Sequence, residues 1–256
     1  MRLLESNWIP SVIVFVFIGV AWHLSTTVFG VPKYLIPSPE SVWAIMVKHP
    51  QMFLANTLVT FRELMGGFVL AVVLAVPLAL FISYSRIFEA FINPVIVISQ
   101  ALPKIAIAPL LLVWFGFGEF PKILMAALIA FFPMLISATT GFKGIEPDVV
   151  SLARSTGASE FRIFWKIRLP SALPAMFGGL KLAITFAVIG AIIGEFLSGD
   201  NGLGYLIQSA SGAQRTDMLF AALIIISVVS VALFYAVEFA ERKLIFWHQS
   251  QIGIVS

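Results

Sequence analysis

The sequence predicts an all-α integral membrane protein, and three observations lead to that fold class. Hydrophobic residues make up 60% of the 256 residues and charged residues 11%, against about 45–50% and about a quarter in a soluble domain. Mean hydropathy is +1.01. The apolar residues also fall into runs of about 20, the length of a membrane-spanning helix. So few charges could not cover a protein surface in water, which excludes a soluble enzyme and a disordered chain.

The same composition excludes several other function classes. A net charge of +3 is too small for the basic surface of a nucleic-acid binder. The absence of cysteine excludes disulfides, thiol catalysis and Cys-ligated zinc. The three histidines are far apart and lack metal-ligand spacing. We therefore expect no nucleic-acid partner, catalytic residue, metal site or cofactor in this chain.

Six apolar runs predict six membrane-spanning helices in a single domain that covers residues 1–256. Four of the runs contain no charged residue, whereas the third contains Lys104 and the fifth contains Lys181. Each run is long enough to cross the hydrocarbon core as a helix. The predicted spans cover residues 9–29, 64–84, 90–118, 123–142, 172–194 and 218–237.

The third predicted span contains three prolines, Pro94, Pro103 and Pro109. Proline removes a backbone donor and clashes with the preceding turn, so we expect this helix to be kinked or broken. A broken helix at membrane depth needs protein or a water-lined cavity around its freed polar groups. The run therefore predicts either a kink at a packing contact or a segment that lines a cavity.

The segment between the first two spans, residues 31–63, contains a predicted surface helix. Ser38-Pro39-Glu40 is typical of a helix start, with serine as the N-cap and proline at the first helical position. Apolar residues at helical spacing follow, which indicates a helix lying on the membrane surface. We expect Asn56 to cap the helix that continues into the second span.

The distribution of Lys and Arg predicts that both termini are cytoplasmic, because cytoplasmic loops are enriched in these residues. In that orientation the basic residues on the opposite side are Lys33, Lys48, Arg62, Lys122 and Arg215. The larger set on the cytoplasmic side is Arg2, Arg86, Lys143, Arg154, Arg162, Lys166, Arg168, Arg242 and Lys243.

The loop between the fourth and fifth spans, residues 143–171, is unusually charged and carries helix signals. Glu146-Pro147-Asp148 is typical of a helix start. The helix is expected to end at Gly157, because glycine tolerates the left-handed conformation of a C-terminal turn. Ser159 can cap a second short helix, which Leu169-Pro170 is expected to end.

On this second helix Phe161, Phe164 and Trp165 are predicted to share one face, since they are three and four residues apart. A helix–Gly–helix element with an apolar face and a basic rim suits docking into a groove on another protein. The alternative is an interfacial helix that rests on lipid headgroups.

The loop also resembles the EAA loop of ABC importer permeases. That pattern is E-A-A, three residues, Gly, nine residues and I-x-L-P, and here it is matched by Ala153, Gly157 and Ile167-Arg168-Leu169-Pro170. Ser151 and Leu152 depart from the first two positions. In the family this loop forms the coupling helix that docks on the ATPase. The resemblance implies coupling roles for Ser151, Leu152, Ala153, Arg154, Gly157, Phe161, Arg162, Ile167, Leu169 and Pro170.

Further segments carry the resemblance over most of the chain. They are residues 34–39 (YLIPSP), 105–110 (IAIAPL), 114–116 (WFG) and 202–205 (GLGY). The chain is similar to the permeases for nitrate, sulfonate, taurine and bicarbonate, and to those for riboflavin and the pyrimidine precursor of thiamine. The implied fold is the type I ABC importer permease fold, in the bacterial inner membrane.

The resemblance implies a permease subunit that is not itself an enzyme. Two copies would form the path for a small solute, an anion or a pyrimidine- or riboflavin-type vitamin precursor. Two ATPase subunits would bind ATP and Mg²⁺, and an extracytoplasmic binding protein would deliver the solute. The chain has no phosphate-binding loop of its own.

Three charged residues lie inside or at the edge of predicted spans: Lys104, Lys181 and Glu195. Charges at membrane depth usually face a cavity or a partner. We therefore regard all three as candidate residues of the solute path. The alternative is that Lys181 and Glu195 reach opposite membrane interfaces and are satisfied locally.

Two other classes of membrane protein fit these residues less well. A secondary transporter driven by an ion gradient is expected to show acidic residues in mid-span or an internal repeat, and neither is evident. An integral-membrane enzyme needs clustered His, Asp or Glu near one membrane face, and the sequence has no such cluster.

Overall fold

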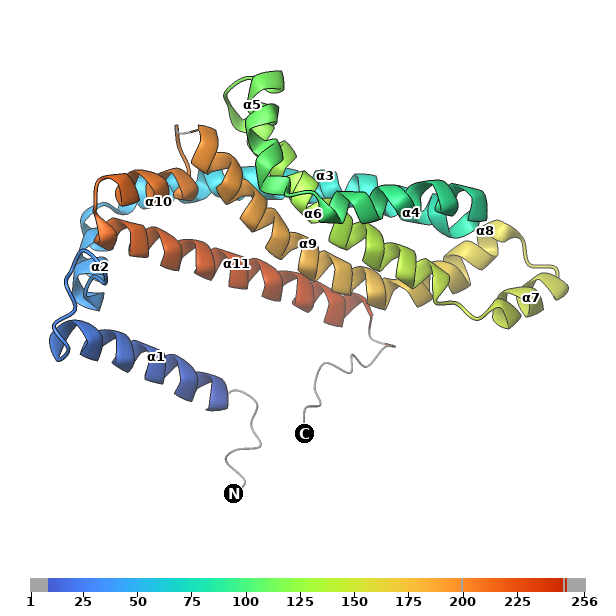
Figure 1. The fold of residues 1–256 in the computed structure, drawn as a ribbon. Coiled ribbons are helices and arrows are strands. Elements are labelled where there is room, and N and C mark those ends of the chain that lie inside the picture. The colour runs from blue at the N-terminus through green and yellow to red at the C-terminus, as the bar shows by residue number, and fades with distance from the viewer. Residues whose placement is uncertain (1–8, 199, 246, 248–256) are drawn as a thin grey trace.

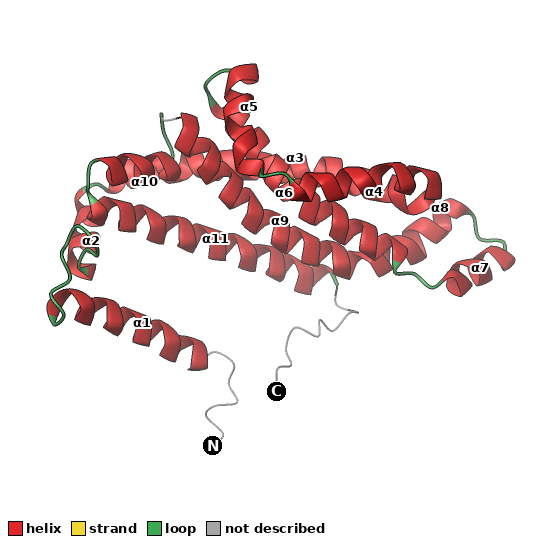
Figure 2. Cartoon of the chain, in the orientation of Figure 1, coloured by secondary structure: helices red, strands yellow, loops and turns green. Residues whose placement is uncertain are grey.

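The computed structural model describes residues 9–198, 200–245 and 247. Within them every regular element is a helix (Figure 2). The elements are α1 (Ile9–Thr27), α2 (Pro39–Lys48), α3 (Pro50–Tyr84), α4 (Arg86–Ala101), η2 (Lys104–Ile107), α5 (Ala108–Phe115), α6 (Glu119–Lys143), α7 (Pro147–Ser155), α8 (Glu160–Ile163), η3 (Phe164–Arg168), α9 (Leu169–Ser198), α10 (Leu203–Gly212) and α11 (Thr216–Leu244).

Helices α3, α6 and α9 form the centre of the bundle, and small residues let them approach closely. A Cβ built on Gly67 of α3 would lie 2.3 Å from Ala126 Cβ of α6. One built on Gly190 of α9 would lie 2.5 Å from Ala126 Cα. Both glycines are therefore required by packing, as is typical where helices associate by van der Waals contact in a membrane.

Four described helices are long and apolar enough to span a membrane: α3, α6, α11 and the continuous helix Glu160–Leu197. The pair α4 and η2–α5 adds a fifth if it counts as one bent span. The described apolar part of α1, Val12–Thr27, is shorter than a full span. The all-helical membrane fold is thus confirmed, whereas the number of six spans stays a prediction.

The predicted break in the third span is confirmed. Helix α4 ends at Ala101, and the chain turns by 91° before it continues through η2 and α5. Pro103 lies in the turn and Pro109 in the first turn of α5, where a proline costs no helical hydrogen bond. Pro94 stays inside α4.

The prediction that Leu169-Pro170 ends the second loop helix is wrong. Residues 164–168 form a π-turn in which the Leu169 N–H donates to the Phe164 carbonyl. The helix therefore passes Pro170, which lies where a shifted hydrogen-bond pattern tolerates its missing donor. As a result α8, η3 and α9 form one helix of 38 residues, Glu160–Leu197.

The helix starts near the second span were partly predicted. Ser38 caps α2, and its hydroxyl accepts the Ser41 N–H at 3.3 Å. The prediction for Asn56 is wrong, because α3 begins at Pro50 and Asn56 lies inside it. Helix α1 contacts the bundle through Trp22, whose ring nitrogen donates to the Pro37 carbonyl at 2.8 Å and whose ring lies 5.9 Å from that of Phe220.

The two ends of the bundle differ. Figure 1 shows α7 and α8 projecting beyond one end, whereas α10 and the start of α11 lie at the other end. Helices α1 and α11 run in opposite directions (Figure 1), as expected for the first and the last of an even number of membrane crossings. Arg2, one of the basic residues on the predicted cytoplasmic side, lies outside the described residues.

Candidate functional site

The first candidate site is the short helix α7 together with the segment formed by α8 and η3 (residues 147–168), which we call the coupling element after the role that the resemblance implies. Gly157 joins them with φ +80°, the left-handed conformation in which an L side chain is strained. The Gly157 and Ala158 N–H groups close the end of α7 on the carbonyls of Arg154 and Ala153, at 2.9 and 3.1 Å. Ser159 then caps α8. Both local predictions are confirmed.

The coupling element presents apolar side chains to the outside. Leu152 is 68% exposed, Phe161 75% and Trp165 53%. The predicted common face is wrong for Phe164, because the π-turn rotates it inward, where its ring stacks on that of Phe142 at 6.4 Å. Of the other residues implied in coupling, Ser151, Arg154, Gly157 and Arg162 are exposed, and Ala153, Ile167, Leu169 and Pro170 are half-buried.

One exposed ion pair joins the two helices of the element. Arg154 Nε lies 2.7 Å from Glu160 Oε1. This hydrogen bond lowers the pKa of the Glu160 carboxyl below its ordinary value, so the pair is charged at neutral pH. At the base of the element Ile163 is fully buried, and the Arg168 guanidinium lies 4.4 Å from the centre of the Tyr84 ring. The element is thus anchored at its base and free at its tip.

Lys104, the first candidate for the solute path, lies at the bend after α4. Its Nζ is 5.4 Å from the centre of the Phe132 ring of α6, within range of a cation–π interaction. A cavity of about 200 Å³ opens beside it, and it is lined by Gln100, Lys104, Ile129, Phe132, Pro133, Ile136 and Phe186. The prolines predicted either a packing kink or a cavity-lining segment, and at this break the chain lines a cavity.

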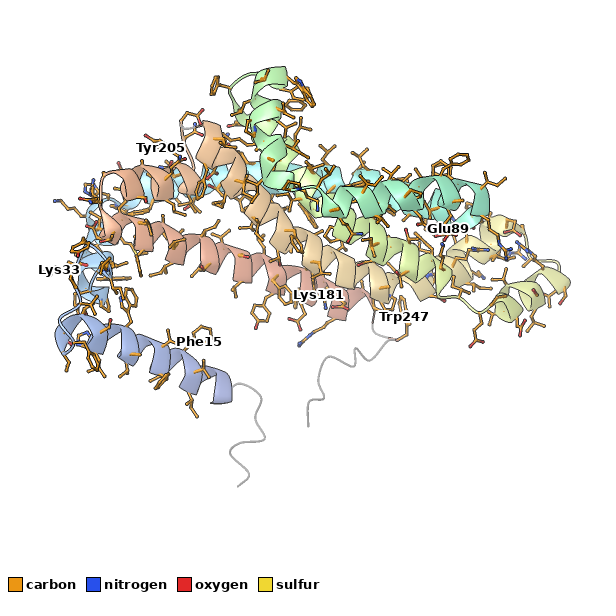
Figure 3. The ribbon with its side chains drawn as sticks, in the orientation of Figure 1. Phe15, Lys33, Glu89, Lys181, Tyr205 and Trp247 are labelled. Carbon is orange, nitrogen blue, oxygen red and sulfur yellow. The ribbon has the colours of Figure 1, made fainter. Side chains whose placement is uncertain are left out.

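Lys181, the second candidate, is paired inside the subunit. Its Nζ lies 2.7 Å from Glu241 Oε2 of α11, and both side chains are about nine-tenths buried. Figure 3 labels Lys181 on the side of α9 that faces α11. Sequence reasoning did not find Glu241, because it lies 60 residues further along the chain and beyond the predicted sixth span.

Glu195, the third candidate, is fully buried in a polar cluster of four side chains: Thr60, Glu63, Lys122 and Glu195. The Thr60 hydroxyl donates to Glu195 Oε1, and the Gly204 N–H donates to Glu195 Oε2. We call these four residues the buried polar cluster. It lies where α3, α6 and α9 meet the start of α10.

Lys122 supplies the positive charge of this cluster. Its ammonium group lies 3.1 Å from Glu63 Oε1 and 2.8 Å from Asp200 Oδ1, and it donates to Asn201 Oδ1 at 2.9 Å. Asp200 and Asn201 thus accept hydrogen bonds from the ammonium group, whereas Glu63 is its buried ion-pair partner. The prediction that Lys122 lies in a loop outside the spans is wrong, because α6 begins at Glu119 and the Lys122 side chain is 1% exposed.

Sequence reasoning missed Glu63 and Lys122 for the same reason. Each stands immediately before an apolar run, the predicted spans 64–84 and 123–142, and each was therefore assigned to a loop. The only available signal was a pair of opposite charges at the starts of the second and fourth predicted spans, which cross in the same direction and therefore begin at the same end of the bundle. The structure does not bring Lys104, Lys181 and Glu195 together, since each has its own set of partners.

Residues 67–246 match the family model described as the binding-protein-dependent transport system inner membrane component. A probable ABC transporter permease of Haemophilus influenzae is 36% identical over 96% of this chain and 98% of its own length. The riboflavin transport system permease of Chloroflexus aurantiacus is 34% identical (90% and 87% covered), and the formylaminopyrimidine transport permease of Halalkalibacterium halodurans is 31% identical (93% and 95%).

A solved structure shows the same fold. The MetNI methionine ABC transporter in an inward-facing conformation superposes with a TM-score of 0.66 and 16% identity, over 76% of this chain and 98% of that one. The resemblance inferred from the EAA loop is therefore confirmed. The chain belongs to the family of binding-protein-dependent transport system inner membrane components, as a multi-pass permease subunit of an ABC importer that leaves ATP hydrolysis to a separate subunit.

Proposed function

We propose that two copies of this chain form the solute path, with six spans each and both termini in the cytoplasm. In this arrangement the coupling element of each copy docks in a groove of an ATPase subunit that binds ATP and Mg²⁺. A binding protein delivers the solute at the opposite end, near α10. The observation that carries this proposal is the coupling element itself, whose exposed Phe161 and Trp165 have no covering surface among the described residues.

Exposed aromatic side chains are typical anchors of protein interfaces, where they fill pockets on the partner. The ring centres of Phe161 and Trp165 lie 6.1 Å apart, so both side chains can enter one groove together. The anchored base and the exposed tip suit an element that receives force from a partner. A helix on lipid headgroups would bury this face in the membrane instead, which the projection of α7 and α8 beyond the bundle disfavours (Figure 1).

For the solute, the cavity beside Lys104 supports a planar N-heterocycle. Phe132 and Phe186 offer aromatic walls, and Gln100 and Lys104 offer a hydrogen-bonding amide and a cation. These groups suit a flat ring with polar edges. Two relatives, at 34% and 31% identity, are named as permeases for riboflavin and formylaminopyrimidine, whereas the taurine and sulfonate permeases are 29% and 28% identical, and this supports the vitamin-precursor class over a small anion. Lys181 and Glu195 act on this path through their helices.

The coupling role is tested with the double variant Phe161→Ala, Trp165→Ala in the permease–ATPase complex. We expect at least a tenfold loss of ATPase retained on the purified permease, because aromatic anchors dominate interface energies. The matched control is Phe15→Ala, which removes a side chain that is equally exposed but lies on α1. Equal retention in both variants would contradict the assignment.

The transport function is tested with proteoliposomes that contain the permease, its ATPase and its binding protein. The solute is first identified in a screen of vitamin precursors and small anions, as the compound that raises the unfolding temperature of the binding protein. We then expect ATP-dependent uptake of that compound. Uptake by the permease alone, driven by an ion gradient without ATP, would instead support the secondary-transporter alternative.

A further inference from the structure

The start of α10 is capped by other helices. Three successive backbone N–H groups donate to side chains of α3 and α9: Gly202 to Asn56 Oδ1 at 2.8 Å, Leu203 to Thr60 Oγ1 at 2.8 Å, and Gly204 to Glu195 Oε2. The first N–H groups of a helix have no partner within it, and the N-cap residue of α10, Gly202, has no side chain to offer. Distant side chains therefore perform the capping that is normally local.

Two glycines make this contact possible. A Cβ on Gly202 would lie 2.2 Å from the carboxyl carbon of Glu195, and one on Gly204 would lie 2.8 Å from its Oε2. The backbone of α10 thus rests directly on the buried carboxylate. The negative charge of Glu195 also lies at the positive end of the α10 dipole, which stabilises the contact.

The loop before α10 is attached a second time. Lys122 of α6 binds Asp200 and Asn201, and Glu63 of α3 lies on its other side. The segment 200–204 is thus bonded to α3, α6 and α9, and three of the side chains that hold it, Thr60, Lys122 and Glu195, are almost completely buried. Breaking a buried charged contact is far more costly than breaking one at the surface, so this segment moves with the helices that hold it.

The helix that carries Glu195 also carries the coupling element. From Glu160 to Leu197 it is continuous, and Figure 1 shows α8 at one end of the bundle and α10 at the opposite end. A displacement of α8 is therefore passed along α9. Whether it reaches α10 depends on the contact between Glu195, Thr60 and the first N–H groups of α10.

We propose that Asn56, Thr60 and Glu195 are positioning residues that make α10 move together with α9, so that ATPase motion at the coupling element reaches the end where the solute enters. The inference rests on the proposed function, since it assumes that ATP drives the coupling element. None of the three residues needs to touch the solute.

The test compares three variants in reconstituted permease–ATPase complexes with the binding protein present. Thr60→Val is isosteric and removes the hydroxyl that accepts from Leu203 and donates to Glu195. Thr57→Val is the matched control, because Thr57 lies one turn earlier on the same helix, is half-buried, and its hydroxyl donates only to the carbonyl of Phe53 at 2.7 Å. Thr60→Ser restores the hydroxyl.

We expect Thr60→Val to lower the maximal rate of uptake about tenfold, as expected when a buried hydrogen-bond network loses its central member. The basal ATPase rate should stay unchanged, because the coupling element is intact. Thr57→Val and Thr60→Ser should behave like the wild type. A purely structural role of Thr60 would lower uptake, ATPase rate and the yield of complex in parallel, and that result would overturn the proposal.

Hydrogen exchange provides a second measurement that does not depend on transport. The amides of residues 202–204 should exchange slowly in both the nucleotide-free and the ATP-trapped complex, and Thr60→Val should raise the exchange rate of this segment in both states. Fast exchange in one state of the wild type would show that α10 separates from α9 during the cycle and would overturn the proposal.

Asn56→Ala covers the case in which Thr60→Val does not assemble, because Asn56 is only half-buried and its loss removes a single acceptor. It should lower uptake several-fold with normal ATPase activity. If the wild-type complex shows no ATP-driven uptake, the proposed function fails. If the wild type transports and both Thr60→Val and Asn56→Ala match Thr57→Val, only the positioning role fails.

Discussion

The two ends of the bundle use ion pairs in opposite ways. At the coupling element, Arg154 and Glu160 form a solvent-exposed ion pair, with more than half of each side chain exposed. At the other end, Lys122 and Glu63 pair with side-chain exposures of 1% and 0%. Exposed pairs contribute little to stability, whereas a buried pair fixes its neighbours because separating it leaves an uncompensated charge. The end that we propose meets the ATPase is therefore adjustable, and the end that holds α10 is fixed.

The largest expected effect follows from removing the buried cation. Lys122→Met should destabilise the folded chain by about 3–5 kcal/mol, the typical cost of leaving one member of a buried pair alone. Thermal unfolding of the purified permease in detergent measures it. Lys166→Met is the control, since Lys166 is exposed and its loss should leave the unfolding temperature unchanged. Similar unfolding temperatures for the two variants would show that the buried pair is dispensable.

A smaller effect is expected where α10 rests on Glu195. Gly204→Ala places a Cβ 2.8 Å from Glu195 Oε2, and overpacking of this kind costs about 1–3 kcal/mol. We expect a lower unfolding temperature and faster hydrogen exchange at the start of α10. Gly212→Ala in the same helix meets nothing within 4 Å and serves as the control. An equal response to the two substitutions would argue against close contact at Gly204.

At the coupling element, a backbone change should affect transport more than stability. Gly157→Pro fixes φ near −65°, whereas the native value is +80°, and it removes the N–H that bonds to Arg154. ATP-driven uptake should be abolished while the unfolding temperature of the permease changes little. Gly157→Asn should keep most of the uptake, because asparagine tolerates the left-handed region. Loss of transport in both variants would point to a need for glycine beyond its conformation.

The smallest effect is expected for the exposed pair. Arg154→Gln should leave the unfolding temperature unchanged between pH 6 and pH 8, because solvent screens this pair. The Arg154 bond lowers the pKa of Glu160 from its ordinary 4.5. The contribution of the pair is therefore present above that ordinary pKa and is lost as the pH falls through the lower folded value. A clear difference between variant and wild type at pH 7 would contradict this view of the coupling end.

Local chemistry made part of this structure predictable. Ser38 and Ser159 cap helices, Gly157 adopts the left-handed turn, and prolines break the third span. Each of these outcomes depends on a few adjacent residues. The buried ion pairs were not predictable in this way, because Lys181 and Glu241 lie 60 residues apart and the contact exists only once the helices pack.

The polar cluster shows a second reason for the difference. A search for apolar runs ends at the first charge, so Glu63 and Lys122 were assigned to loops although α3 and α6 continue past them. Glu195 was found because it follows an apolar run, but its partners on α3 and α10 were not. Asn56 was expected to cap its own helix and instead caps α10.

Because α8 and α9 form one continuous helix, the number of residues between the coupling element and Glu195 matters for function. In a helix, one inserted residue adds only about 1.5 Å of length but rotates everything beyond it by about 100°. A single insertion between Ile163 and Glu195 would therefore turn the carboxylate away from α10 while leaving composition and hydropathy almost unchanged. The bend between α4 and α5 carries no such constraint. Natural variation in length should accordingly be absent from α9 and concentrated in the loops.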